Sequence, residues 1–254
     1  MFNFKSLVKR RSKAIAFIDY DYWFYSYNNL FQSKPDLKYW KESLPAEYMV
    51  DEILVFGDFS SRQLSDELEK ARRITKTVIE TSDSSIGNKK GTTEFVMLNY
   101  IYQYMDERKD IDTYILFAGD GRFESLVNYL VLKKRFKVIL YGVMGSVSRR
   151  LQTAATRFIC LPTDGEKMRM YYKMIIEDMN YVSDKSKIIP TFWSTIDAVS
   201  QKNNVPYDEV RCALTKMISD GYILQKERHL SLTKSVRVVY ANWELLIRDG
   251  LWTP

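Results

Sequence analysis

Histidine and cysteine are scarce in this chain of 254 residues, which contains one His and two Cys. A metal site built from several histidines is therefore excluded, and a Ser-His-Asp or Cys-His arrangement would have to use His229. Cys160 and Cys212 form no C-x-x-C pair, so neither a zinc knuckle nor a disulfide framework is expected. Reduced thiols in the cytoplasm are the simplest interpretation. The chemistry must then depend on carboxylates, hydroxyls, lysine, arginine or tyrosine.

Long apolar runs are also missing. No stretch approaches the roughly 18 apolar residues of a membrane span, and the residues around Phe2–Val8 do not form the apolar core of a signal peptide. We therefore expect no membrane partner. Hydrophobic residues make up 46% of the chain and charged residues 28%, which is a globular composition and argues against disorder.

The net charge of +6 is concentrated at the N-terminus, where residues 1–13 carry five of the cations. They are Lys5, Lys9, Arg10, Arg11 and Lys13. Such a basic arm can contact phosphate backbones, and it can equally be a solvated tail.

Residues 14–163 alternate between short apolar runs and amphipathic segments. The apolar runs do not alternate with polar residues, which is typical of buried strands in a parallel sheet. We therefore predict an α/β fold with helices on both faces of the sheet. One expected helix carries an apolar stripe of Phe95, Leu98, Tyr102 and Met105. The expected strands are Ala14–Asp19, Ile53–Asp58, Thr77–Glu80, Tyr114–Asp120 and Lys137–Gly142.

The pattern changes after residue 163. Apolar residues from Met168 to Met179 recur at the spacing of one helix face, which indicates a docking or dimer helix and hence a possible homo-oligomer through residues 164–180. Residues 164–188 are expected to form this helix and a linker. Residues 189–254 read as two helices and a hairpin, the order of a small winged-helix-like domain that could contact DNA, RNA or protein.

Acidic residues end three of the apolar runs. Asp58 is best explained as a cap, but Asp19 and Asp120 would meet at the carboxyl edge of the sheet, where ligands bind in such folds. Glu94 begins a helix that could bring a third carboxylate to this edge. A cluster of hard oxygen ligands suits Mg²⁺ or Mn²⁺, which can activate water against a phosphodiester.

Four motifs occur in an order that resembles the NYN domain of the PIN-like nuclease superfamily, over about residues 13–163. The resemblance implies a Rossmann-like parallel sheet and an RNA-cleaving site that uses Mg²⁺ or Mn²⁺. It places the acids of the family on Asp19, Glu94 and Asp120, as catalytic residues and metal ligands. The motifs are FIDYD at Phe17–Asp21, KKGTTEF at Lys89–Phe95, LFAGDGRF at Leu116–Phe123 and SRRLQTAATRFICLP at Ser148–Pro162.

The chain departs from the family pattern at three positions. Arg122 stands where a second Asp is usual, Tyr22 where an Asn is usual, and Glu94 where Asp is commoner. Arg122 could neutralise the carboxylates in place of a metal, or it could clamp a phosphate. Asp21 and Glu124 are nearby acids that could compensate for the changed charge.

Further substrate contacts are expected around this edge. Ser148 and Arg149 border the cleft in the resemblance and could contact a phosphate. In the aromatic segment that follows Asp19, Tyr20 or Tyr22 could reach solvent and stack on an unpaired base, while the other rings pack in the core.

A rival interpretation starts from Asp19, Tyr20 and Asp21, which resemble the nucleophile motif of haloacid-dehalogenase phosphatases. Trp23 stands where that family prefers Thr or Val. We therefore favour a cytoplasmic, divalent-metal-dependent endoribonuclease. The alternative is a nucleic-acid-binding or regulatory module with little or no activity, because of Arg122.

Overall fold

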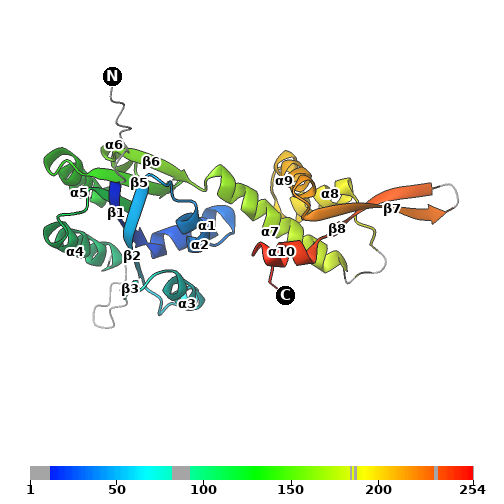
Figure 1. Ribbon diagram of the computed structural model, residues 1–254, viewed down its shortest axis with the longest axis horizontal. Coiled ribbons are helices and arrows are strands. Elements are labelled where there is room, and N and C mark those ends of the chain that lie inside the picture. The colour runs from blue at the N-terminus through cyan, green and yellow to red at the C-terminus, as the bar shows by residue number, and fades with distance from the viewer. Residues whose placement is uncertain (1–11, 82–91, 184, 186–187, 232–233, 254) are drawn as a thin grey trace, which may run out of the picture. The chain divides into compact units, whose positions relative to one another are not determined.

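The computed structural model describes residues 12–81, 92–183, 185, 188–231 and 234–253. Most of the predicted basic arm, and Lys89–Gly91 of one motif, lie outside this range. The chain divides after Leu161 into two compact units, which Figure 1 shows in ribbon form. Each unit has its own apolar core, and we describe each by itself.

The first unit is built on a parallel sheet of six strands in the order β3-β2-β1-β4-β5-β6. This is the predicted α/β architecture with a Rossmann-like core. Five strands match the predicted apolar runs, and β6 is an additional edge strand whose mixed sequence gave no strand pattern. The strands are β1 (Ser12–Asp19), β2 (Tyr48–Gly57), β3 (Thr77–Glu80), β4 (Thr113–Phe117), β5 (Lys137–Val143) and β6 (Arg157–Leu161).

Strand β1 lies at the centre, between β2 and β4. Its residues from Ala14 to Ile18 are completely buried, because helices cover both faces of the sheet. Two-sided burial explains why this strand is apolar throughout instead of alternating. Its last residue, Asp19, is therefore placed at the carboxyl edge of the sheet by a rigid element.

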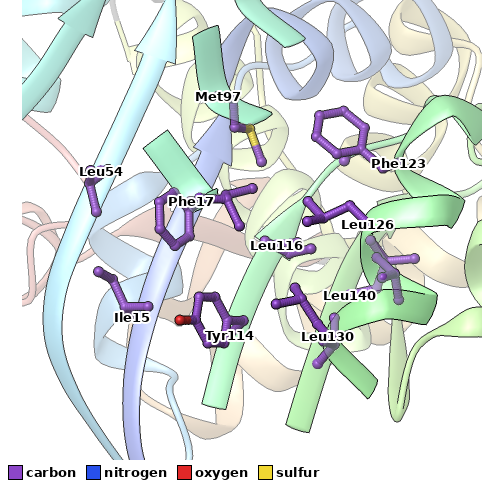
Figure 2. Close-up of a cluster of buried hydrophobic side chains, with 14 of the residues drawn as sticks. Ile15, Phe17, Leu54, Met97, Tyr114, Leu116, Phe123, Leu126, Leu130 and Leu140 are labelled. Carbon is purple, nitrogen blue, oxygen red and sulfur yellow. The ribbon is translucent and has the colours of Figure 1, made fainter. Parts of the chain in front are cut away.

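One face of the sheet packs against α4 and α5. Phe17 and Leu116 from the strands meet Met97 from α4 and Leu126 from α5, as Figure 2 shows. Tyr114 lies in the same cluster and stacks 6.1 Å from Phe17 between ring centroids. The helices and turns that contribute to this face are α4 (Thr92–Glu107), a 3₁₀ turn (Gly121–Phe123), α5 (Glu124–Asn128), a π-helical turn (Tyr129–Lys133) and α6 (Arg149–Ala154).

Helix α4 packs in a different phase from the one predicted. It buries Met97 and Ile101, whereas Phe95 and Tyr102 are 64% and 47% exposed. The predicted stripe is right for Leu98 and Met105, which are half-buried against the core, and wrong for Phe95 and Tyr102. The mismatch arises because α4 is apolar around most of its circumference. Periodicity alone could not decide which side faced the sheet.

Aromatic rings fill the opposite face, beneath α1 (Tyr20–Phe31) and α2 (Leu37–Glu42). The Phe117 ring lies 4.6 Å from Trp23, 4.9 Å from Trp40 and 4.7 Å from Tyr141 between centroids. Tyr20 is buried as well, so of the two rings expected to reach solvent only Tyr22, which is half-buried, remains a candidate. The helix α3 (Ser65–Ile74) completes the unit.

The second unit has the helix–helix–hairpin order that was predicted, and this arrangement is compatible with a winged-helix-like domain. A short bridge from Thr191 to Val238 adds to the two-stranded sheet β7-β8. Among the described residues, every helix is too short or too polar to cross a membrane. The elements are α7 (Asp164–Ser183), α8 (Phe192–Asn203), α9 (Tyr207–Ser219), β7 (Ile223–Ser231), β8 (Lys234–Ala241) and α10 (Trp243–Arg248).

The apolar stripe of α7 packs within this unit. Tyr172, Ile175, Ile176 and Met179 are buried against α8 and α9. Because these side chains pack inside the unit, the stripe gives no support to the predicted homo-oligomer through residues 164–180. Helix α7 is thus part of the second core and not a separate connector.

Candidate functional site

Asp19 is the most deeply buried acid of the site. It ends β1 and caps α1, where its Oδ1 accepts a hydrogen bond of 2.9 Å from the amide of Tyr22. The side chain is only 4% exposed. Burial raises the pKa of Asp19 to about 8, although the Tyr22 amide acts in the opposite direction. Three neighbouring carboxylates raise it further: Asp21, Glu94 and Asp120.

Asp21 is already engaged in structural hydrogen bonds. Its carboxylate accepts from the amide of Asp58 at 3.0 Å and from the hydroxyl of Thr93 at 2.7 Å. These bonds tie the start of α1 to the end of β2 and to the first turn of α4. Because the carboxylate is occupied in this way, it is poorly suited to be the mobile acid–base group that the phosphatase interpretation requires of Asp21.

Arg122 bridges the other two predicted acids. Its Nη2 donates to Glu94 Oε2 at 2.6 Å and to Asp120 Oδ2 at 2.8 Å, while its amide donates to Asp120 Oδ1 at 2.7 Å. The Arg122 side-chain hydrogen bond holds the pKa of Asp120 below its usual value. Burial raises the pKa of Glu94 in spite of the guanidinium. The arginine that replaces the family's second Asp therefore binds the acids directly.

We tested whether these residues fit a divalent ion. The donor set fits by chemistry, because Asp19, Glu94 and Asp120 offer only hard carboxylate oxygens. The charges of Glu94 and Asp120 raise the pKa of Asp19, and the charge of Asp120 raises the pKa of Glu94. The side chains of Glu94 and Asp120, however, are positioned as a pair that Arg122 bridges. Among the described residues, no group of three or more His, Cys, Asp or Glu is placed to hold a metal. A metal would need Glu94 and Asp120 to exchange Arg122 for the ion.

A pocket of about 670 Å³ lies beside the acids. Asp19, Tyr22 and Glu94 are among its lining residues, with Tyr25 and Asn29 farther along α1. The Tyr22 hydroxyl accepts from the amide of Val143 at 2.8 Å and from the hydroxyl of Ser146 at 3.2 Å, so this side chain also fixes the end of β5 and the loop after it. Its predicted contact with substrate stays a prediction.

Ser148 and Arg149 lie near the turn that carries Asp120. The Ser148 amide donates to the carbonyl of Gly119 at 2.9 Å, and its side chain lies against Gly121. Arg149 is exposed and lines a smaller pocket of about 340 Å³ together with Asn128 and Arg150. The structure thus brings Asp19, Glu94, Asp120 and Arg122 into one cluster, with Ser148 next to it and Arg149 on a separate pocket.

Sequence reasoning missed two residues of this region. Thr93 is buried and orients Asp21, and its position in the KKGTTEF motif was the available signal. Phe95, assigned to the core from periodicity, is exposed beside the cluster, with the Arg122 guanidinium 5.9 Å from its ring centroid. No sequence signal distinguished it from a core residue.

Comparison with known proteins identifies the family of the first unit. The family model of the NYN domain matches residues 13–162. A solved crystal structure of a protein of unknown function from Vibrio parahaemolyticus is similar with a TM-score of 0.52 at 20% identity, over 61% of this chain and 96% of that chain. At this identity the likeness shows the fold alone. No match is found among curated proteins. Because the family model spans more than half of the sequence and covers all three acids of the cluster, the chain belongs to the NYN domain family.

Proposed function

We propose that the first unit hydrolyses phosphodiester bonds of RNA at the cluster of Asp19, Glu94 and Asp120, with Mg²⁺ or Mn²⁺. The observation that carries this proposal is the convergence of carboxylates from β1, α4 and the turn after β4, of which Asp19 and Glu94 line one pocket. Such a concentration of negative charge attracts a cation. Membership of the NYN family, which belongs to the PIN-like nucleases, favours RNA as the substrate.

Asp19, Glu94 and Asp120 are the side chains that would hold the ion. When bound, such an ion activates water and neutralises charge on the phosphodiester. The chain's own contribution is positional: Asp19 is fixed by its cap to α1, and the turn of α4 that carries Glu94 is tied to α1 by the bond from Thr93 to Asp21. Arg122, once released from the acids, presents a planar donor fork that suits a phosphate.

A second candidate function is RNA binding without cleavage. The specific observation in its favour is the bridge that Arg122 makes between Glu94 and Asp120. A guanidinium that stays there compensates part of the negative charge and occupies oxygens that a metal would need. The Arg122 side chain is 53% exposed, so solvent reaches the bridge and leaves room for the guanidinium to turn away from it. Cleavage and metal-binding measurements separate the two candidates.

The test is cleavage of a labelled, mixed-sequence RNA by the wild type and by Asp19→Asn combined with Asp120→Asn, with Mn²⁺, with Mg²⁺ and with EDTA. We expect metal-dependent cleavage that the double substitution abolishes. Asp106→Asn is the control, because this acid also lies in the first unit but is 89% exposed on α4. Cleavage that continues in EDTA, or in the double variant, would contradict the proposed site.

Arg122→Gln separates hydrolysis from simple binding. If the arginine stands in for the metal, this variant gains Mn²⁺ affinity in calorimetry while the wild type binds none and cleaves nothing. If Arg122 contacts the phosphate during hydrolysis, the variant keeps its metal affinity and cleaves more slowly. RNA retention by a wild type that does not cleave would support the binding module.

A further inference from the structure

An exposed aromatic ring borders the acid cluster. Phe95 follows Glu94 directly on α4, and its side chain is 64% exposed, the largest value among the exposed large hydrophobic residues of the described chain. Single exposed apolar side chains are common and need no explanation by themselves. The position of this ring, beside an arginine and two carboxylates of the site, is what gives it a use.

The second observation is the arrangement of Arg122 around this ring. The guanidinium lies over the Phe95 ring at 5.9 Å from its centroid and donates at the same time to Glu94. A cation and an aromatic face are therefore adjacent at one edge of the cluster. In RNA a base is joined to its phosphate through one ribose, so a strand whose phosphate meets Arg122 carries a base within reach of Phe95.

We propose that Phe95 is the stacking platform for an unpaired base of the RNA strand, next to the phosphate that Arg122 contacts. This inference rests on the proposed function only in taking RNA as the ligand, and it holds for the cleaving and for the merely binding protein. Every base presents a π-face, so the platform tolerates different sequences. Because bases in a duplex are covered by their neighbours, Phe95 selects single-stranded RNA.

The chain contains a matched control for this residue. Tyr102 is also an exposed aromatic on α4, and it lies seven residues after Phe95, two helical turns farther from the acid cluster on the same side. A general effect of removing an exposed ring from α4 would appear at both positions. An effect of base stacking at the site would appear only at Phe95.

The experiment measures binding of the full chain in EDTA to a labelled, unstructured single strand and to a duplex of the same sequence. Phe95→Leu is expected to weaken single-strand binding by roughly 5- to 150-fold, the range of one lost base stack. Phe95→Trp retains the affinity because it retains the ring. Tyr102→Leu leaves single-strand binding unchanged, and Phe95→Leu leaves duplex binding unchanged.

A direct readout accompanies the affinities. An RNA that carries 2-aminopurine at successive positions reports stacking by fluorescence quenching, and we expect one position to be quenched by the wild type and by Phe95→Trp but not by Phe95→Leu. A loss of affinity from a merely structural defect would leave this pattern intact. Circular dichroism verifies that the variants fold.

The outcomes separate this inference from the proposed function. If the wild type binds or cleaves single-stranded RNA and Phe95→Leu behaves identically, the stacking platform is wrong and the proposed function stands. An equal loss of single-strand affinity in Phe95→Leu and Tyr102→Leu would also show that the stacking platform is wrong and leave the proposed function standing. If the wild type neither binds nor cleaves RNA, the proposed function fails, and the platform fails with it.

Discussion

The hydroxyl of Thr93 donates a hydrogen bond of 2.7 Å to the carboxylate of Asp21. The same hydroxyl lies 2.6 Å from the hydroxyl of Thr81, and since Thr93 donates its only hydrogen to the carboxylate, Thr81 must donate to Thr93. This short chain of bonds joins the residue after β3, the first turn of α4 and the first turn of α1. Glu94 is the next residue on α4, so these bonds hold the helical turn that carries it.

Thr93→Val tests this linkage. Valine keeps the shape but removes the hydroxyl, so the Asp21 carboxylate loses a donor in a buried place, and we expect the free energy of unfolding to fall by about 1–3 kcal/mol. RNA binding and cleavage should weaken as well, because the turn of α4 that carries Glu94 loses its hydrogen bond to α1. Thr215→Val is the control, since its exposed hydroxyl bonds only within α9. Urea denaturation with equal losses in the two variants would contradict this role.

Two neighbouring glycines should respond very differently to alanine. A Cβ on Gly119 would lie 2.1 Å from the Tyr22 ring and 2.6 Å from the Ser146 carbonyl oxygen, which is backbone and cannot swing aside. A Cβ on Gly121 would meet the movable hydroxyl of Ser148 at 3.1 Å and the Ser148 Cβ at an ordinary contact distance of 3.5 Å. We expect Gly119→Ala to lower the melting temperature strongly and Gly121→Ala to change it little. Similar melting temperatures for both would show that the Tyr22 packing is loose.

Glu67 should make stability depend on pH. It is 2% exposed and accepts from Lys70 at 3.0 Å, Lys34 at 3.1 Å and Tyr20 at 3.1 Å. Burial acts to raise its pKa, but the two lysines outweigh it and hold the pKa below the usual value. A lowered carboxyl pKa stabilises the fold above the unfolded value of about 4.3, and this stabilisation is lost as the pH falls through the folded value.

We therefore expect Glu67→Gln to lower the free energy of unfolding at pH 7 by about 1–3 kcal/mol, and to differ less from the wild type below about pH 4. Denaturant titrations at several pH values measure this difference. Glu69→Gln on the same helix is the control, because that side chain is 69% exposed. A difference that grew towards acid pH would mean that burial, and not the lysines, dominates.

Arg135 adopts a left-handed backbone conformation with φ of 61°. Side chains with a Cβ are strained there, whereas glycine is not, and the side chain is exposed. Arg135→Gly removes this strain but also increases the conformational entropy of the unfolded chain, which offsets part of the gain. We expect the free energy of unfolding to rise by up to about 1 kcal/mol. Arg135→Ala retains the Cβ and should give no gain. A destabilised glycine variant would mean that the arginine side chain makes a stabilising contact.

The sheet was predictable from the sequence because two-sided burial demands uninterrupted apolar residues, as at Ala14–Ile18. Strand β6 escaped prediction because it lies at the edge and includes the exposed Arg157 and Cys160. The side of α4 that faces the sheet could not be predicted because this helix has apolar residues on most sides and therefore gives no clear stripe. Short-range patterns thus predict elements better than they predict which side of an element faces the core.

The candidate site was predictable only as far as the topology determines it. Asp19 and Asp120 follow neighbouring parallel strands, so the carboxyl edge of the sheet brings them near each other. The bridge from Arg122 to Glu94 depends on side-chain rotamers of residues 28 positions apart, which no spacing rule specifies. The roles of Thr93 and Phe95 likewise depend on tertiary packing.

The central place of β1 also affects how the chain is made. This strand is synthesised before either of its partners, and it pairs with β2 through residues up to Phe56 and with β4 through residues up to Phe117. About a hundred further residues must therefore be synthesised before β4 can pair with the second edge of this apolar strand. Such long-range pairing slows folding and leaves an aggregation-prone apolar segment exposed to other nascent chains. Yield in the cell should consequently depend on chaperones that bind apolar segments during translation.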